Sequence, residues 1–208
     1  MNKKVEKILK FRFAPSPTGG VHIGTARTAL FNFIAAQSLK AKIVLRMEVT
    51  DLKRSSKKFE DDIIEDLKWL GLKWDEFYRQ SERFEDYIKS AKYLIEKDYA
   101  YHCFCSPERI EEVNKKLISE GKMPGYDGKC RELDKNVLER NLKDNIPYTI
   151  RFKMPKAEIV FDDLIRGQIR FDSSVLNDFV LIKSDKSPSY NFAVVIDDAE
   201  MGITHVLR

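Results

Sequence analysis

The chain of 208 residues has little cysteine and little histidine, with three of each. A small, odd number of cysteines does not form a disulfide framework, and it favours a reducing cytoplasm as the location. The uncharged runs fall well short of the roughly 20 residues that cross a membrane. The lysine-rich start of the chain lacks the apolar segment of a secretory signal. No internal repeat or low-complexity segment is visible. These absences exclude secreted disulfide-stabilised, membrane-spanning and repeat classes.

The residues that are present are typical of a globular protein. Hydrophobic residues make up 43% and charged residues 34% of the chain. The length gives room for one large or two small domains with a sizeable core. The 37 basic residues nearly cancel the 33 acidic ones, which leaves a net charge of +4. That balance is compatible with RNA binding but does not argue for it.

The stretch from Arg12 to Asn32 carries the strongest local signal. A short apolar run gives way to a Pro/Gly-rich turn, and apolar residues then recur at helical spacing. This predicts a strand, a tight loop and a helix that begins near His22–Gly24. Free backbone N–H groups at such a helix start attract phosphate oxygens. The stretch contains neither the G-x-x-x-x-G-K-[ST] loop nor the G-x-G-x-x-G pattern. From the residues alone, an ordinary strand-to-helix connection is an equally good interpretation.

The strings P-S-P-T-G, H-I-G and A-R-T-A-L-F-N in this stretch resemble the first signature of the class I glutamyl-tRNA synthetases. Residues His22 to Thr25 take the place of the family's HIGH motif, with Thr25 where a second histidine is common. The resemblance implies ATP-dependent activation of L-glutamate as glutamyl-adenylate and transfer to the 3′ end of tRNA-Glu, with Mg²⁺ accompanying ATP. It implies catalytic roles for His22 and Gly24, and ATP binding by Thr18, His22 and Gly24.

The resemblance also implies an amino-acid pocket. Arg12 and Arg208 would bind the substrate carboxylates, because guanidinium groups pair with them bidentately. Ser16, Glu48 and Tyr190 would complete glutamate recognition through hydrogen bonds. Tyr190 and Arg208 could instead be a packed aromatic ring and a cation at a strand end.

Glu48 lies at the end of an expected strand, in the string R-M-E-V-T-D. Ligands of open parallel sheets bind at that edge. The family shows R-I-E-D-T-D here, so Val49 stands where the family has a carboxylate. The alternative is that Glu48 and Asp51 are solvated charges at the strand end.

Three cysteines form a candidate metal site: Cys103 and Cys105 in a C-x-C pattern, and Cys130 further on. A structural zinc site needs four nitrogen or sulfur ligands. Some members of the family carry C-x-C…C-x-H, and here Glu132 stands in the fourth place. The alternative to zinc is three thiols without a metal, some of them packed in a strand.

The predicted fold class is α/β, a Rossmann-like parallel sheet of the class I synthetase type with an inserted, smaller α+β acceptor-binding domain. Alternating strands and helices predict right-handed crossovers, and the later cluster of strands predicts an antiparallel insertion. We expect the first half of the catalytic domain over 1–87, the inserted tRNA-acceptor-binding domain over 88–187, and a return to the catalytic domain over 188–208. The return is expected to form a short helix and then a strand, 203–208. Trp69 and Trp74 are expected to pack in the interior.

The resemblance spans nearly the whole chain but covers less than half of such an enzyme. A family member continues with a second, lysine-bearing signature and a helical anticodon-binding part. We therefore expect an N-terminal fragment, missing its C-terminal part, with little or no catalysis of its own. Two alternatives stay open: a non-catalytic nucleotide- or tRNA-binding module derived from a synthetase, and an H-x-G nucleotidyltransferase with a small-molecule acceptor. The predicted insertion and the string T-A-R-T-A-L-F-N favour the synthetase over the latter.

Overall fold

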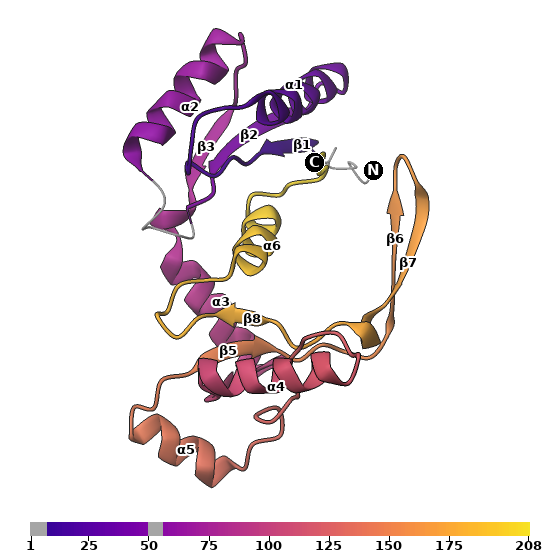
Figure 1. The fold of residues 1–208 in the computed structure, drawn as a ribbon. Coiled ribbons are helices and arrows are strands. Elements are labelled where there is room, and N and C mark those ends of the chain that lie inside the picture. The colour runs from indigo at the N-terminus through magenta and orange to yellow at the C-terminus, as the bar shows by residue number, and fades with distance from the viewer. Residues whose placement is uncertain (1–7, 50–55) are drawn as a thin grey trace, which may run out of the picture. The chain divides into compact units, whose positions relative to one another are not determined.

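The computed structural model describes residues 8–49 and 56–208, so Asp51 lies outside the described residues. The chain divides into two compact units. The first comprises residues 1–87 and 190–208, and the second comprises residues 88–189. Figure 1 shows the elements of both.

The first unit contains a three-stranded parallel sheet in the order β1-β2-β3. The strands are β1 (Lys10–Phe13), β2 (Lys42–Met47) and β3 (Glu76–Arg79). Helix α1 (Ile23–Ser38) connects β1 to β2, and α2 (Lys57–Trp69) follows β2. The predicted α/β class with a parallel sheet is confirmed.

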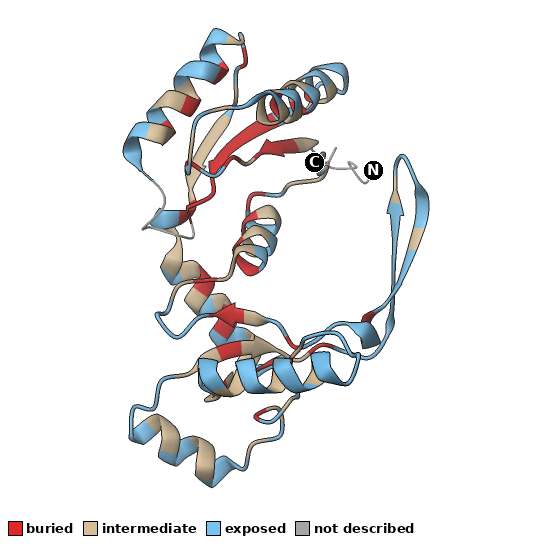
Figure 2. Cartoon of the chain, in the orientation of Figure 1, coloured by how far each residue is buried: buried red, intermediate tan, exposed pale blue. Residues whose placement is uncertain are grey.

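The two faces of this sheet differ because side chains alternate along a strand. Phe13, Leu45 and Met47 share one face and form a buried cluster with residues of α1 and α2. Figure 2 shows the resulting burial of β1 and β2. Arg12 and Arg46 occupy the alternate positions and point to the opposite face. The sheet thus has an apolar face under two helices and a second face that carries charge.

The remaining elements of the first unit are a short 3-10 turn η1 (Gln80–Glu82), the first turn of α3 (Phe84–Glu96) and helix α6 (Tyr190–Glu200). The apolar face of α2 includes the buried residues Ile63 and Leu67. Trp74 packs against that core, but the Trp69 side chain is 84% exposed, so its predicted packing is wrong.

The expected strand over 203–208 does not form. The backbone N–H groups of Thr204 and His205 both donate to the carbonyl oxygen of Lys10, at 3.0 and 3.1 Å. His205 then makes a single bridge to Phe11. In a parallel ladder every second residue of a strand bonds to the partner strand. Here the pairing consists of the single bridge at His205.

The second unit contains a three-stranded antiparallel sheet in the order β4-β5-β8. Its strands are β4 (Ala100–Cys103), β5 (Thr149–Phe152) and β8 (Val180–Ile182). Helix α4 (Pro107–Ser119) has Ser106 as its N-cap, and the Ser106 side chain accepts a hydrogen bond from the Arg109 backbone N–H.

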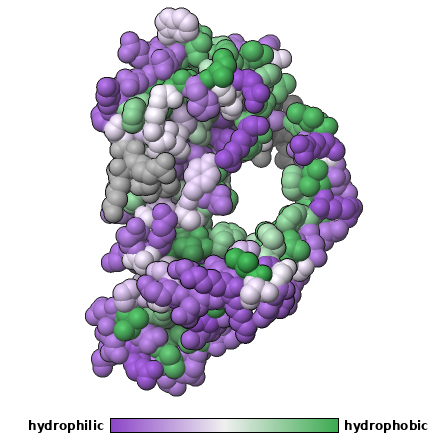
Figure 3. Space-filling view, viewed as in Figure 1, coloured by the Kyte–Doolittle hydropathy of each residue, from purple (hydrophilic) through white to green (hydrophobic). Residues whose placement is uncertain are grey.

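Further elements of the second unit are α5 (Lys135–Lys143), the hairpin strands β6 (Glu158–Asp163) and β7 (Gly167–Asp172), and a short turn η2 (Ser173–Val175). The hairpin is largely exposed (Figure 2). Polar and apolar side chains are both visible along it in the space-filling view (Figure 3). Helix α5 was not predicted from the sequence.

Candidate functional site

The loop between β1 and α1 ends at His22, which caps the helix. The Nδ1 atom of His22 accepts hydrogen bonds from the backbone N–H groups of Gly24 and Thr25, at 3.1 and 3.3 Å. An imidazole nitrogen that accepts carries no proton, so this arrangement assigns the ring proton to Nε2. Nε2 lies 3.0 Å from the Thr25 hydroxyl. The ring is exposed at the helix start.

This geometry corrects part of the sequence-based expectation. We expected the N–H groups at the start of α1 to be free for phosphate oxygens. Instead, two of them are bonded to the His22 ring. The group presented at the helix start is therefore the Nε2 side of the imidazole, and the two amides already have a hydrogen-bond partner.

One cavity of about 580 Å³ in the first unit brings the predicted site residues together. The carboxyl ends of β1 and β2, the loop before α1 and the last residues of the chain contribute to its walls. The predicted residues that line it are Arg12, Ser16, Thr18, His22, Gly24, Glu48, Tyr190 and Arg208. Residues almost 200 positions apart in the sequence thus border one space.

The loop that forms this cavity is fixed to the strand ends by backbone hydrogen bonds. The Glu48 backbone N–H donates to the carbonyl oxygen of Pro15 at 2.9 Å, and the Thr18 N–H donates to that of Ser16 at 2.8 Å. These bonds hold Ser16 and Thr18, both exposed, at the mouth of the cavity, next to the carboxyl end of β2.

Glu48 is a buried carboxylate at the cavity wall. Burial raises its pKa, while Arg46, a hydrogen bond from Tyr190 and the charge of Arg12 act in the opposite direction. Burial also raises the pKa of Tyr190, and the charge of Glu48 adds to this effect. The Arg208 guanidinium carbon lies 5.8 Å from the centre of the Tyr190 ring. Cations and a carboxylate therefore meet around a tyrosine hydroxyl.

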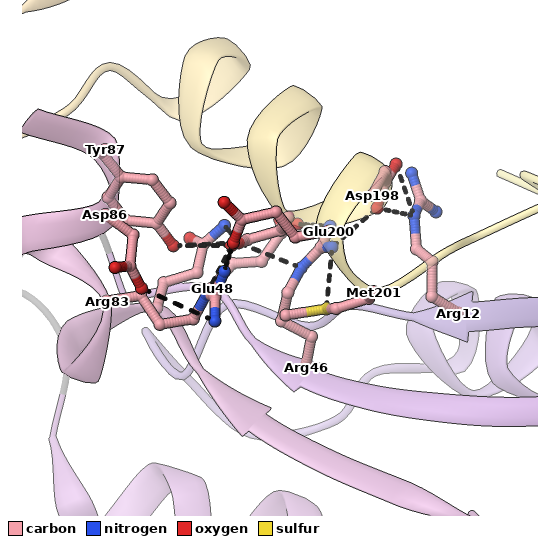
Figure 4. Close-up of polar contacts among 11 residues, drawn as sticks. Arg12, Arg46, Glu48, Arg83, Asp86, Tyr87, Asp198, Glu200 and Met201 are labelled. Atoms are coloured by element: carbon pink, nitrogen blue, oxygen red, sulfur yellow. Dashed lines mark hydrogen bonds and ion pairs between the residues drawn. The ribbon is translucent and has the colours of Figure 1, made fainter. Parts of the chain in front are cut away.

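Behind the cavity wall, Arg46 lies between two carboxylates (Figure 4). Its Nη2 is 3.0 Å from Glu48 Oε1, and its Nη1 is 2.6 Å from Asp198 Oδ1. Burial lowers the pKa of Arg46, but the bonds and charges of Asp198 and Glu48 outweigh it, so the pKa lies above its ordinary value. Asp198 also accepts a hydrogen bond from Arg12 Nε, at 3.3 Å.

A second carboxylate of α6, Asp197, is fully buried and bound from several sides. It accepts hydrogen bonds from Gln80 Nε2 at 2.9 Å, Arg83 Nε at 2.8 Å and the Tyr87 hydroxyl at 3.0 Å. Burial raises the pKa of the Tyr87 phenol, and the Asp197 charge adds to it. Asp197 therefore attaches α6 to η1 and to the first turn of α3.

Sequence reasoning missed Arg46, Asp197 and Asp198. A signal for Arg46 is present: it is a charged residue inside the apolar run of β2, two positions before Glu48 and on the same face. The adjacent acids 197 and 198 interrupt an apolar helix in a similar way. Charged residues at positions where the pattern is apolar indicate buried ion pairs.

In the second unit, the three cysteines form one cluster. Their Sγ atoms all lie within 4.8 Å of one another, and Cys105 and Cys130 are 3.7 Å apart. The Tyr126 hydroxyl lies 3.3 Å from Cys103 Sγ and 3.7 Å from Cys105 Sγ. It also accepts a hydrogen bond from the Cys130 backbone N–H at 2.8 Å. A phenolic oxygen therefore adjoins all three cysteines.

Glu132, the expected occupant of the fourth ligand position, is not part of this cluster. Its side chain is 82% exposed and lies 4.0 Å from Lys153 Nζ. The spacing alone left open whether Glu132 is a ligand, and in the structure its carboxylate is exposed to solvent. The sequence offered no signal for Tyr126 beyond its place in the P-G-Y-D-G turn.

In the part of the chain that the structure describes, no helix is long and apolar enough to cross a membrane.

The parallel α/β unit, the helix-capping histidine and the cavity at the strand ends agree with the catalytic domain of a class I aminoacyl-tRNA synthetase. The family model for tRNA synthetases class I (E and Q), catalytic domain, matches residues 8–208. The chain belongs to this family.

Relatives with close sequence similarity carry the name glutamate–tRNA ligase. The protein from Hydrogenobaculum sp. (strain Y04AAS1) is 52% identical over 202 residues, which cover 97% of this chain and 44% of the relative. That from Aquifex aeolicus (strain VF5) is 50% identical and is covered to 42% of its length. The chain thus spans less than half the length of these relatives.

A solved structure agrees with these matches. The crystal structure of a glutamate tRNA ligase from Elizabethkingia meningosepticum CCUG26117, in complex with its amino acid, has a TM-score of 0.89 and 38% sequence identity to this chain. The match covers 97% of this chain and 43% of that one. The predicted class I synthetase fold is therefore confirmed.

Proposed function

We propose that this chain is the N-terminal part of a glutamate–tRNA ligase, which activates L-glutamate with ATP and transfers it to the 3′ end of tRNA-Glu. The observation that carries the proposal is the single cavity that two arginines, a buried carboxylate and the capping histidine of α1 share. The family membership and the names of the relatives support the same activity.

The charges of the cavity match those of glutamate. Arg12 and Arg208 offer guanidinium groups to the two carboxylates of the amino acid. Glu48 offers a buried negative charge to the ammonium group, and the Tyr190 hydroxyl beside it helps to orient the substrate. Ser16 at the cavity mouth contributes a hydrogen bond. Glutamine would leave an arginine without its carboxylate, which is the physical basis for selecting glutamate.

Adenylate formation asks mainly for positioning and charge stabilisation. A carboxylate oxygen of glutamate attacks the α-phosphorus of ATP in line, and pyrophosphate leaves. The His22 Nε2–H stabilises charge on the phosphate oxygens, while Gly24 and Thr18 border the space for the nucleotide. Mg²⁺ bound with ATP would neutralise part of the phosphate charge. A ribose hydroxyl of the 3′-terminal nucleotide of the tRNA then attacks the carbonyl carbon of the adenylate, and AMP leaves.

We assign the second unit, residues 88–189, to the tRNA acceptor end, as the family resemblance implies. Its cysteine cluster fits a structural zinc ion. Zinc–sulfur bonds of about 2.3 Å in a tetrahedron place sulfur atoms about 3.8 Å apart, close to the 3.7 Å between Cys105 and Cys130. Tyr126 is the proposed fourth ligand in place of Glu132.

The zinc proposal is tested by metal analysis of purified variants. We expect about one equivalent of zinc in the wild type and in Glu132→Gln, and a clear loss in Cys130→Ser. Tyr126→Phe keeps the ring but removes the oxygen, so it should weaken zinc retention against a chelator. Retention by Tyr126→Phe together with loss in Glu132→Gln would contradict the assignment.

The activity is tested by ATP–pyrophosphate exchange in the presence of tRNA, using the longer chain that contains these residues. We expect exchange that depends on L-glutamate and is absent with L-glutamine or L-aspartate. The 208 residues alone should show far less exchange, since the residues lining the cavity in the described chain include no lysine. Exchange that followed another amino acid would overturn the proposal.

A further inference from the structure

Four charged side chains form an alternating row in the first unit: Glu48, Arg46, Asp198 and Arg12. The contacts along it are 3.0 Å from Glu48 to Arg46, 2.6 Å from Arg46 to Asp198 and 3.3 Å from Asp198 to Arg12. Glu48 and Arg12 at the ends line the cavity, whereas Arg46 and Asp198 in the middle do not. Figure 4 shows the middle pair between β2 and α6.

We infer that Arg46 and Asp198 are positioning residues that fix Glu48 and Arg12 at the spacing of the ammonium and carboxylate groups of an amino acid. This inference rests on the proposed function. Neither residue touches the substrate. They act through the two cavity residues that do.

The geometry of Arg46 suits this role. Its side chain is 0% exposed, and its two terminal nitrogens bind different carboxylates at the same time. A planar guanidinium holds both partners in one fixed arrangement, whereas a lysine ammonium is a single mobile point charge. The charge of Arg46 also favours the ionised form of Glu48, which burial disfavours. Without Arg46, the cavity would lose both the position and the charge of its anion.

The geometry of Asp198 fixes the other end. It accepts a hydrogen bond from Arg12 through Nε. A guanidinium can bind a carboxylate along its Nε edge or through its two terminal nitrogens. Because Asp198 takes Nε, the terminal fork of Arg12 is the edge that remains suited to a substrate carboxylate.

The test compares two ligands, L-glutamate and glutarate, which differ in the amino group. Dissociation constants are measured by calorimetry for the wild type, Glu48→Gln, Asp198→Asn and Arg46→Lys. Glu48→Gln should weaken the binding of L-glutamate about tenfold and that of glutarate little, since a hydrogen bond to a charged group has roughly that effect. Asp198→Asn should weaken the binding of both ligands by the same factor. Arg46→Lys should combine both effects and reduce the preference for L-glutamate over glutarate.

Arg83→Lys is the matched control. Arg83 binds Asp197 at 2.8 Å in the neighbouring cluster, and it is not part of the row. It should change thermal stability but leave the ratio of the two dissociation constants unchanged. A double variant, Arg46→Lys with Glu48→Gln, should lower the ratio no further than Glu48→Gln alone, because the two residues act on the same ammonium group.

The outcomes separate the two hypotheses. If the wild type binds L-glutamate and Arg46→Lys keeps the wild-type ratio, Arg46 is purely structural and the inference is overturned, while the proposed function stands. Wild-type affinity for both ligands in Asp198→Asn would also overturn it. If the wild type does not bind L-glutamate, the proposed function fails and this inference fails with it.

Discussion

Two side chains in the cavity, His22 and Glu48, have their chemistry set by the neighbours that they touch. The His22 ring accepts two backbone N–H groups through Nδ1 and so presents Nε2–H. Glu48 is buried beside Arg46 and Tyr190, and both neighbours favour the ionised form of its carboxylate. Single substitutions can therefore separate the structural role of each residue from its chemical role.

Replacing His22 separates capping from catalysis. His22→Ala should destabilise the protein by about 1 kcal/mol, since α1 loses its cap. His22→Asn should keep most of that stability, because asparagine is a good N-cap, but it lacks the imidazole. Loss of one donor to a developing charge lowers the rate roughly 10²- to 10³-fold. Urea denaturation measures the first effect, and pyrophosphate exchange in the longer chain measures the second. Full exchange activity in His22→Asn would rule out the role of the ring.

Glu48 should make L-glutamate binding sensitive to acid. Burial raises its pKa above the ordinary 4.5, so its charge is lost as the pH falls through that raised value, earlier than for a free carboxylate. Arg46, Arg12 and Tyr190 face the carboxylate and limit the shift. We expect affinity to fall on acidification more steeply in the wild type than in Glu48→Gln. The variant controls for titration of the ligand. Parallel profiles would contradict the assignment.

At the scale of elements, helix α6 is attached to the sheet by charge. Its two adjacent acids, Asp197 and Asp198, face the alternate positions of β1 and β2, where Arg12 and Arg46 lie. The apolar sides of helices α1 and α2 cover the other face. The strand alternation of the sheet thus separates a packed core from a charged layer that supports the cavity.

Removing the Asp197 carboxylate, which binds α6 to its neighbours, should lower the free energy of unfolding. Asp197→Ala takes from Arg83 its fully buried carboxylate partner, while Arg46 keeps Glu48 and Asp198. Removing one partner of a buried ion pair costs about 3–5 kcal/mol. Glu200→Gln is the control, since Glu200 pairs with the same Arg83 but is half exposed, and such surface pairs contribute about 0–1 kcal/mol. Chemical denaturation gives both values. Equal effects of the two substitutions would show that the burial of Asp197 is not decisive.

At the scale of the whole molecule, each unit carries its own candidate ligand site. The cavity belongs to the first unit, and the cysteine cluster belongs to the second. A ligand that binds a folded unit stabilises that unit by mass action. Each ligand should therefore change the stability of the unit that binds it.

We expect two separable responses in thermal unfolding. L-Glutamate at about 100 times its dissociation constant should stabilise the first unit by roughly 2.7 kcal/mol. A zinc chelator should lower the stability of the second unit. Hydrogen exchange, resolved by peptide, assigns each change to its residues. A chelator effect confined to residues of the first unit would contradict the division of roles.

The sequence by itself determined the family, the α/β class and the start of α1, because these depend on local strings: the P-S-P-T-G turn, the H-I-G helix start and the apolar spacing around them. It also indicated which residues to examine in the cavity. Local pattern and strand period are properties of neighbouring residues, so they can be read without a fold.

Only the tertiary structure decided which partners those residues have. It showed that the His22 ring accepts hydrogen bonds from the amides of its own helix. It also showed that Arg46 contacts Glu48 and that Asp198 contacts Arg12. Tyr126, rather than Glu132, adjoins the cysteines. The tertiary structure also replaced the expected final strand with a single bridge at His205. Such pairings join residues up to about 190 positions apart, and burial sets their strength. Neither property is a function of local sequence.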